Sequence, residues 1–221
     1  AGCGTITIGN GARQKAGTTY MPSLRWFHEG RVWKIDAGLG HSQASNHYRD
    51  IDKGFFNGVS TQRSNVTVAF AEINPTRPST MTATTPAGTA VDGTDINVAT
   101  IGSARSNQGD VLAVIASAHL NARRSFATRF PLSLKSGLDL RREDRDMRNP
   151  QRSYTFVGPD RAANTADDVV GRYDLVATGY SGQRMAWDLP ARRWQSTAKL
   201  WQLYQQNPVW WTLNETSALS T

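Results

Sequence analysis

The chain has 221 residues, of which 38% are hydrophobic, and its formal net charge at pH 7 is +7. No apolar run approaches the roughly 18 residues that a membrane helix needs, which excludes a helical membrane protein. A basic chain often binds nucleic acid, but no basic run or aromatic RNA-binding motif is present, so we expect no nucleic-acid partner. The single cysteine, Cys3, excludes an internal disulfide and a Cys-x-x-Cys metal site.

The first periodic stretch predicts two strands, at about 19–28 and 31–45. Leu24 and Trp26 alternate with polar residues in the first run, and Trp33, Ile35 and Ala37 do so in the second. Side chains alternate across a strand, so each run has one apolar and one polar face. We therefore expect a hairpin with these apolar side chains on one face.

The turn of this hairpin is expected at Glu29-Gly30. A two-residue turn there places Trp26 opposite Trp33 and keeps the apolar residues of both strands on the same face. The same register sets Arg25 opposite Lys34, which is an unfavourable pair of like charges, with Asp36 diagonal to Arg25 as partial relief. Turn length and apolar pattern agree on this register.

Residues 46–109 are predicted to form a long loop. The segment is rich in Thr and Ser, contains Pro75, Pro78 and Pro86, and has one short strand candidate at Val66–Phe70. Connections in compact domains usually have about 4–6 residues, so a loop of this length is rare.

The longest alternating stretch predicts two further strands, at about 110–124 and 130–146. Even positions are apolar in both, with Leu112, Val114, Ala116, Ala118, Leu120 and Ala122 in the first and Phe130, Leu132, Leu134, Leu138 and Leu140 in the second. The turn near 125–129 must therefore hold an odd number of residues or a bulge. Each run exceeds the roughly 5–6 residues typical of soluble strands and reaches the roughly 9–11 that cross a bilayer.

Residues 147–221 are predicted as a second long loop, which contains one short helix at roughly 191–206. Asp188 and Pro190 suit the start of this helix, and Asn207-Pro208 suits its end. The best ligand-binding candidates lie in and around it, namely Trp187, Arg192, Arg193, Trp194 and Trp201. Aromatic faces stack on sugars and flat ligands, and arginines hold anions. The alternative is that these aromatic side chains pack the small helix against its surroundings.

No pattern of residues indicates an enzyme, so we expect no catalytic residue, no metal and no cofactor. His41 and His47 lack the spacing of a metal site. Oxygen-bearing side chains follow the turn at Gly158-Pro159, namely Asp160, Asn164, Asp167 and Asp168. Calcium takes such ligands, but the spacing of an EF-hand and its closing Glu are missing, so a solvated turn is the favoured interpretation.

The connections alternate in length: a short turn, a long loop, a short turn and a long tail. Alternate connections of an up-and-down sheet lie at opposite ends, so both short turns share one end. Outer-membrane barrels have this asymmetry, and Trp26, Trp33, Phe126 and Phe130 near the turns suit an aromatic girdle. The pattern predicts an all-β fold, an antiparallel up-and-down segment of a transmembrane β-barrel with long extracellular loops. A soluble β-sandwich is the alternative.

Three stretches resemble TonB-dependent outer-membrane receptors. The run Phe130–Asp146, with the sequence FPLSLKSGLDLRREDRD, resembles a barrel strand that leads into an extracellular loop. Trp33–Phe56, which includes YRDIDKGFF, and Leu203–Pro208, with the sequence LYQQNP, are similar to large, loop-rich members of the family.

The resemblance implies a barrel of about 22 strands with an N-terminal plug, of which this chain offers about four strands and no plug. Residues 1–221 are therefore expected to be a partial β-barrel domain. The implied function is uptake of a scarce nutrient, such as a siderophore or a carbohydrate, with energy passed through TonB. Expected partners are outer-membrane lipid, an extracellular small ligand and TonB through the missing N-terminal region, and the expected location is the bacterial outer membrane. The alternative is a soluble β-sandwich module that binds a ligand or carbohydrate.

Overall fold

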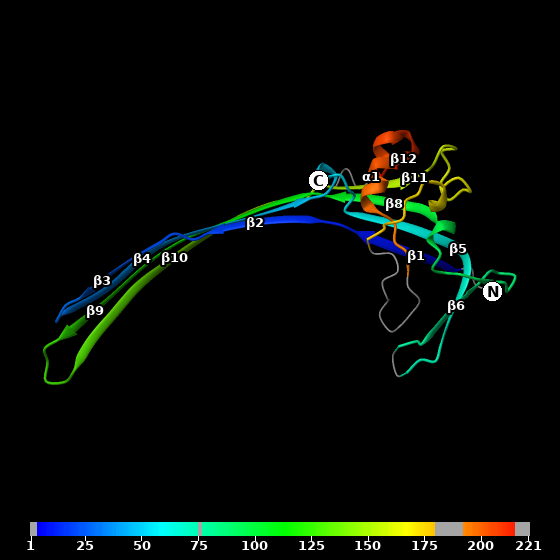
Figure 1. Cartoon of the computed structure of the whole chain (residues 1–221). Helices are drawn as coiled ribbons and strands as arrows, with labels where there is room; N and C mark the ends of the chain where they lie inside the picture. Colours follow the sequence, from blue (N-terminus) through cyan, green and yellow to red (C-terminus); the bar gives the residue numbers. More distant parts are fainter. Residues whose placement is uncertain (1–3, 75–76, 180–191, 215–221) are drawn as a thin grey trace. The chain divides into compact units, whose positions relative to one another are not determined.

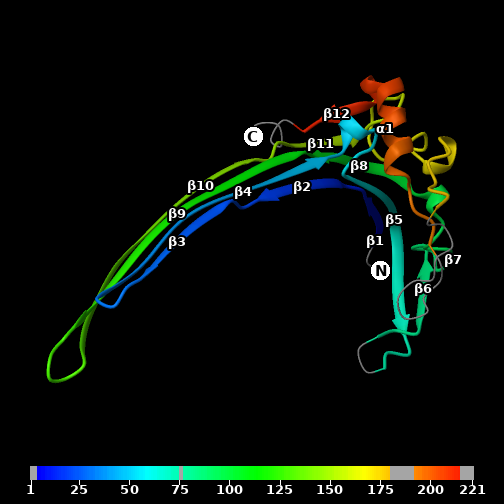
Figure 2. The same cartoon turned by 60° about the vertical axis from the view of Figure 1, so that its left-hand side comes forward.

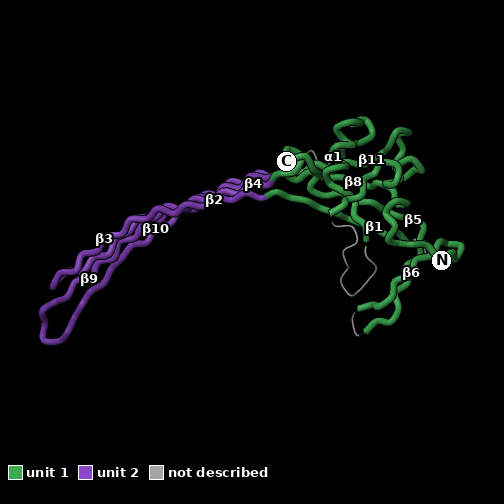
Figure 3. Tube along the Cα trace, viewed as in Figure 1, with its two compact units in different colours: residues 1–14, 49–108, 150–221 green, residues 15–48, 109–149 purple. Residues whose placement is uncertain are grey.

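A computed structural model describes residues 4–74, 77–179 and 192–214. These residues are mostly antiparallel β-sheet with one α-helix, which confirms the all-β prediction. Its strands form two sheets, and among the described residues neither sheet closes into a barrel. No helix in the described part of the chain is long and apolar enough to cross a membrane. The chain divides into two compact units, which Figure 3 distinguishes by colour: unit 1 comprises 1–14, 49–108 and 150–221, and unit 2 comprises 15–48 and 109–149.

Unit 2 is built from five antiparallel strands, β2 (Gln14–Tyr20), β3 (Ser23–Glu29), β4 (Trp33–Arg49), β9 (Gly109–Phe126) and β10 (Leu132–Arg148). The sheet order is β10-β9-β4, and β4 pairs along its other edge with β2 and with β3. Figures 1 and 2 show β3, β4, β9 and β10 side by side. The β3–β4 and β9–β10 turns lie at the same end, because Trp33 pairs with Arg124 and Phe126 pairs with Leu132. Both predicted hairpins therefore exist and share one sheet.

The strand predicted at 19–28 is interrupted in the structure, where β2 ends at Tyr20 and β3 begins at Ser23. Pro22 lies in the gap, and a proline has no N–H to donate to a sheet. Its carbonyl still accepts a hydrogen bond from the His41 N–H at 3.0 Å. The two short strands therefore follow β4 one after the other.

The predicted register of the first hairpin is wrong by four residues. Glu29 pairs with Lys34 and Trp26 with Ala37, and the Gly30 N–H donates to the Trp33 carbonyl at 2.8 Å across a longer turn. A shift by an even number keeps the apolar side chains on one face, so the apolar pattern alone cannot separate the two registers. The observed register replaces a repulsive pair by an attractive one, since Lys34 Nζ lies 3.4 Å from Glu29 Oε1.

The second hairpin has the predicted geometry. Five residues, Ala127 to Pro131, separate the paired ends Phe126 and Leu132, so the turn has the odd length that the sequence requires. Even positions pair with even positions along the whole ladder, as Leu120 does with Leu138. The apolar residues of β9 and β10 consequently share one face.

The described residues of unit 1 contain seven strands, of which all but β1 lie where the sequence predicts two long loops. They are β1 (Gly4–Gly11), β5 (Gly58–Ala71), β6 (Thr80–Thr84), β7 (Ala90–Val91), β8 (Thr100–Asn107), β11 (Gln151–Phe156) and β12 (Trp211–Leu213). They form a sheet of order β12-β11-β8-β5-β6-β7, with β1 also paired to β5. The prediction of irregular structure over 46–109 and 147–221 is therefore wrong for these segments. The short strand predicted at Val66–Phe70 does lie within β5, but elsewhere in these polar segments no apolar alternation is long enough to reveal a strand.

The helix α1 (Thr197–Gln206) starts later than predicted. Asp188, Pro190 and Ala191 lie outside the described residues, but the described residues before Thr197 are extended rather than helical. The Trp194 carbonyl accepts from the Ala177 N–H, and the Ser196 N–H donates to the Leu175 carbonyl, both at 2.7 Å. The Ser196 hydroxyl then accepts from the Lys199 N–H and caps the helix. Its end at Asn207 is as predicted. The short 3₁₀ helices are η1 (Ile51–Lys53), η2 (Ile96–Val98), η3 (Val170–Arg172) and η5 (Pro208–Trp210).

The core of unit 1 is aromatic and lies between α1 and the sheet. Phe56 is fully buried and makes edge-on contacts with Trp201 and Tyr204 of α1 at ring-centroid distances of 5.3 and 5.8 Å. Phe156 of β11 is also fully buried, and its ring lies 4.8 Å from that of Trp211. The side chains of Leu200 and Leu203 complete this layer.

Candidate functional site

The most unusual feature of the described residues is an exposed apolar face on unit 2. Strand pairing places these side chains on it, and we call them the apolar face: Leu24, Trp26, Ile35, Ala37, Leu39, Ala118, Leu120, Ala122, Leu134, Leu138 and Leu140. The leucines are about as exposed as surface residues, with 65% of Leu134 and 58% of Leu138 accessible. The described strands of unit 2 form a single layer, so no second sheet within that unit covers this face.

On β10 the apolar face is confined to the half of the strand nearest the turn, whereas on β9 the same face stays apolar through Ala116 and Val114 to Leu112. On β10 it begins beside Leu132, which lies on the same face, and ends at Leu140, which at about 3.4 Å per residue step is roughly 27 Å along the strand. Beyond this point the same face becomes charged, and ion pairs Arg142–Asp144 (2.9 Å) and Arg148–Asp146 (3.2 Å) follow along the strand. With the roughly 35–45° tilt of barrel strands this length spans about 20 Å of height, which is close to the apolar band of about 25 Å in outer-membrane barrels.

Aromatic side chains border this band at the turn end. Trp33 and Phe130 are exposed there by 43% and 76%. Trp26, which is exposed by 54%, lies within the band instead, because Trp26, Ala37, Leu120 and Leu138 are paired in register. The Arg124 guanidinium lies over the Trp33 ring at 5.5 Å and over the Phe126 ring at 4.9 Å. Aromatic rings with a cation beside them are typical of the boundary between hydrocarbon and water.

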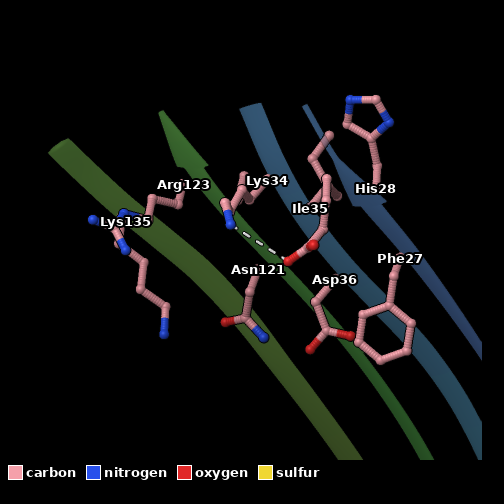
Figure 4. A pocket seen from close by; sticks show the side chains of 10 residues that line it. Phe27, His28, Lys34, Ile35, Asp36, Asn121, Arg123 and Lys135 are labelled. Carbon is pink, nitrogen blue, oxygen red and sulfur yellow. Dashed lines mark hydrogen bonds and ion pairs between the residues drawn. The ribbon is translucent and has the colours of Figure 1, made fainter. Parts of the chain in front are cut away.

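The opposite face of unit 2 is polar. Arg25 Nε lies 3.2 Å from Asp36 Oδ1, and His119 Nε2 lies 3.5 Å from Asp36 Oδ2. Figure 4 shows Asp36 and Asn121 as neighbours on adjacent strands, with Phe27 beyond Asp36. Two faces of opposite character therefore occupy one sheet.

A row of cations crosses this polar face near the turns. Lys34 pairs in register with Arg123, and Arg123 with Lys135, so three like charges are adjacent on three strands. Glu29 neutralises only Lys34, as the dashed line in Figure 4 marks. The hollow that these residues line has a volume of about 240 Å³, which is below the usual size of a site that encloses a small ligand. This row is better suited to hold a single anionic group than a whole ligand.

The structure does not bring the predicted ligand-binding residues together in one site. Trp187 lies outside the described residues. Trp201 stacks on Tyr204 at 5.2 Å and is part of the aromatic core, so the packing interpretation describes it. Arg192 is half-buried and directed to Met81 Sδ at 3.7 Å, Trp194 is half-buried, and Arg193 is exposed. Among the described residues, no hydrogen bond or cation–π contact joins Arg192 or Arg193 to Trp201.

The oxygen-bearing residues after Gly158 form a tight loop that Asn164 anchors. The Asn164 side-chain oxygen accepts hydrogen bonds from Gln62 and Thr100, so it serves the packing of the loop. Asp168 is fully buried, and its Oδ1 has no hydrogen-bond partner. Burial raises the pKa of Asp168, with a further contribution from the charge of Asp167.

Histidines do not form a metal centre in the described part of the chain. His47 Nδ1 lies 2.6 Å from Asp110 Oδ1, and the His41 ring contacts the Tyr20 ring at 5.8 Å. No group of three or more His, Cys, Asp or Glu side chains among the described residues is placed to hold a metal ion.

One buried carboxylate was missed by sequence reasoning. Asp50 is fully buried, and it accepts hydrogen bonds from the Ser106 hydroxyl at 2.9 Å and from the Asn107 N–H at 2.6 Å. It also caps η1 through the Ile51 N–H at 2.5 Å. The stretch Tyr48–Phe56 contains both Asp50 and the buried Phe56, so this stretch has a structural role in unit 1. Nothing in the local sequence distinguishes Asp50 from the exposed Asp52.

Neither the family models nor the curated proteins with which this chain was compared contain a match.

Proposed function

We propose that this chain is a segment of an outer-membrane β-barrel receptor of the TonB-dependent kind, which takes up a scarce nutrient. The observation that carries the proposal is the exposed apolar face of unit 2. Large side chains gain about 1.5–3 kcal/mol each when they leave water, so a face with several exposed leucines is costly in water. Contiguous apolar patches of this extent mark membrane or protein contacts.

Lipid is the favoured covering because of the height of the band and the aromatic side chains at its edge. A β-sandwich needs a second sheet facing the first, with the apolar side chains of both in contact. Within unit 2, the described strands offer one layer only. In a bilayer the apolar face contacts hydrocarbon and the polar face lines the interior of the barrel.

The free edge of β10 supports a larger barrel. Among the described strands, β10 pairs on one side only, with β9. A strand of 17 residues therefore has a row of unpaired N–H and C=O groups, which cannot be left unsatisfied in hydrocarbon. Further strands would pair there and close the sheet.

The connections are consistent with a receptor. The two short turns share one end of the sheet, and the segments 49–108 and 150–221 continue from the other strand ends. In outer-membrane barrels the short turns are periplasmic and the long connections extracellular. Unit 1 would then be the part that meets an extracellular ligand, and TonB would act through a region that precedes this segment.

Two measurements test this function. Sedimentation velocity should find the chain associated in plain buffer and uniform in detergent, because the apolar face and the open edges need a partner. A uniform monomer in plain buffer that melts cooperatively would contradict the membrane assignment. In the source cells, loss of the gene should abolish uptake of one scarce nutrient, and loss of TonB should do the same. Uptake that continues without TonB would contradict the receptor class.

A further inference from the structure

We propose that the loop 158–168 of unit 1 binds a calcium ion between the carboxylates of Asp167 and Asp168. The proposal goes beyond receptor function, because unit 1 contains this loop whether or not unit 2 lies in a membrane. Three observations carry it: a buried carboxylate oxygen without a partner, the convergence of two carboxylates beside Gly158, and the hydrogen bonds that fix both carboxylates.

The buried oxygen is Oδ1 of Asp168. The residue is 0% exposed, its Oδ2 accepts from the Thr165 N–H at 3.0 Å, and its Oδ1 has no partner. A carboxylate in this position is costly unless a positive charge or a donor meets the free oxygen. Within the described part of the chain, no Lys or Arg forms an ion pair with Asp160, Asp167 or Asp168.

The two carboxylates meet beside Gly158. A Cβ atom placed on Gly158 would stand 2.4 Å from Asp168 Oδ1 and 3.0 Å from Asp167 Oδ2. One oxygen of each carboxylate thus lies against the backbone of a residue that has no side chain. Gly158 has a φ of +60°, which a glycine adopts without strain.

The other oxygens of the two carboxylates are held in place. The Thr165 hydroxyl donates to Asp167 Oδ1 at 2.5 Å, while the Thr165 N–H holds Asp168. The Asp160 N–H points to Asp167 Oδ2 at a longer 3.4 Å, which leaves that oxygen weakly bonded. One threonine therefore fixes both carboxylates with their less engaged oxygens directed to the same place.

Calcium fits this donor set better than other metal ions. It takes six to eight oxygen ligands in an irregular arrangement, including loop carbonyls and water, and so does not need three acidic side chains. Magnesium requires a near-ideal octahedron, and zinc prefers nitrogen and sulfur. The ion would neutralise two adjacent carboxylates and fasten the loop to η3.

Terbium luminescence gives a direct test, because Tyr173 is an internal sensitiser. The Tyr173 hydroxyl donates to the Asp167 carbonyl at 2.8 Å, and its ring lies 5.9 Å from that of Trp210. Added Tb³⁺ should show sensitised emission from the whole chain in detergent, and Ca²⁺ should displace it at lower concentration than Mg²⁺. Asp168→Asn, which keeps the shape of the side chain, should weaken Tb³⁺ and Ca²⁺ binding by roughly tenfold or more.

The matched control is Asp174→Asn. Asp174 neighbours Tyr173, but its side chain is 93% exposed and pairs with Lys199 at 3.1 Å, so this variant should bind Tb³⁺ as the unaltered chain does. Asp167→Asn is the second variant, and circular dichroism confirms that each variant is folded. Absence of sensitised emission from the unaltered chain would overturn the proposal. Undiminished Ca²⁺ affinity in Asp168→Asn, or an equal loss in Asp174→Asn, would also overturn it.

Discussion

Asp36 lies diagonally across the β3–β4 pair from Arg25, and the Arg25 Nε atom is 3.2 Å from its carboxylate. Directly opposite Lys34 stands Glu29, at 3.4 Å. The Glu29–Lys34 contact depends on the observed register, whereas Asp36 would lie diagonal to Arg25 in the predicted register as well. In the register that the apolar pattern and a two-residue turn predict, Arg25 would instead face Lys34. The pairing of charges across the two strands therefore favours the longer turn.

Cysteine pairs on the polar face can measure this register. In a Cys3→Ser background, the pair Glu29→Cys and Lys34→Cys should form a disulfide on mild oxidation, because residues paired across strands have the Cα separation that a disulfide needs. The pair Arg25→Cys and Lys34→Cys is the control, and it should stay reduced since Arg25 pairs with Gly38. Preferred crosslinking of the control pair, read by mass spectrometry, would restore the two-residue turn.

Trp201 is expected to act through packing. Trp201→Ala should destabilise α1 by roughly 2–3 kcal/mol, less than the 3–5 kcal/mol of a fully buried aromatic residue, because the Trp201 ring contacts Phe56 and Tyr204 but stays partly exposed. Hydrogen exchange of the α1 amides measures this loss locally. Arg193→Ala, at an exposed position, is the control and should change exchange little. Unchanged α1 protection in Trp201→Ala together with lost sugar or anion binding would make Trp201 a ligand residue.

Asp50 is expected to be a structural carboxylate. In Asp50→Asn an amide NH₂ replaces one acceptor and meets either the Asn107 N–H or the Ser106 hydroxyl and Ile51 N–H. The lost hydrogen bonds in a buried site should cost about 1–3 kcal/mol, seen as faster exchange of the Asn107 and Ile51 amides. Asp52→Asn should cost under about 1 kcal/mol because its ion pair with Arg49 is partly exposed. Equal effects of the two substitutions would show that burial does not set the importance of Asp50.

An arginine on the apolar face should be costly only in a membrane. Leu138→Arg places a charge near the middle of the band, where lipid-facing arginine costs roughly 2–4 kcal/mol. His119→Arg is the matched control, because His119 pairs with Asp139 on the polar face at almost the same depth. Folding yield into lipid vesicles should fall for the first variant and stay near that of the unaltered chain for the second. Equal yields would contradict a lipid-facing Leu138.

The sequence predicted the parts of the fold in which period-two alternation is long. Leucines occupy even positions from Leu132 to Leu140, which predicts that they share one face of β10. It also predicts a turn with an odd number of residues before β10, and the structure has both features. The register of β3 and β4 escaped prediction because shifts by an even number keep every side chain on its face. Only the opposite charges of Glu29 and Lys34 distinguish the observed register from the predicted one.

The strands of unit 1 could be predicted from alternation only at Val66–Phe70 of β5. The other strands show little apolar alternation, and the sheet is stabilised by a core built from residues far apart in the sequence, such as Phe56, Phe156 and Trp211. Asp168 became a candidate ligand only through burial, which no local pattern indicates, although the sequence did gather Asp167 and Asp168 after a Gly-Pro turn. The packing role of Trp201 likewise depends on its contacts with this core.

Lipid quenching of labels along β10 tests the central claim most directly. Single cysteines at Leu134, Leu138 and Leu140, and at Lys135, Asp139 and Arg141 on the other face, carry a fluorophore in a Cys3→Ser background in lipid vesicles. Spin labels on the lipid chains should quench the three even positions and leave the three odd positions bright, since alternate side chains lie on opposite faces. Gly137 is unsuitable, because a side chain there would collide with Asn121. Even positions that escape quenching in the folded, vesicle-bound protein would contradict the membrane assignment of this face.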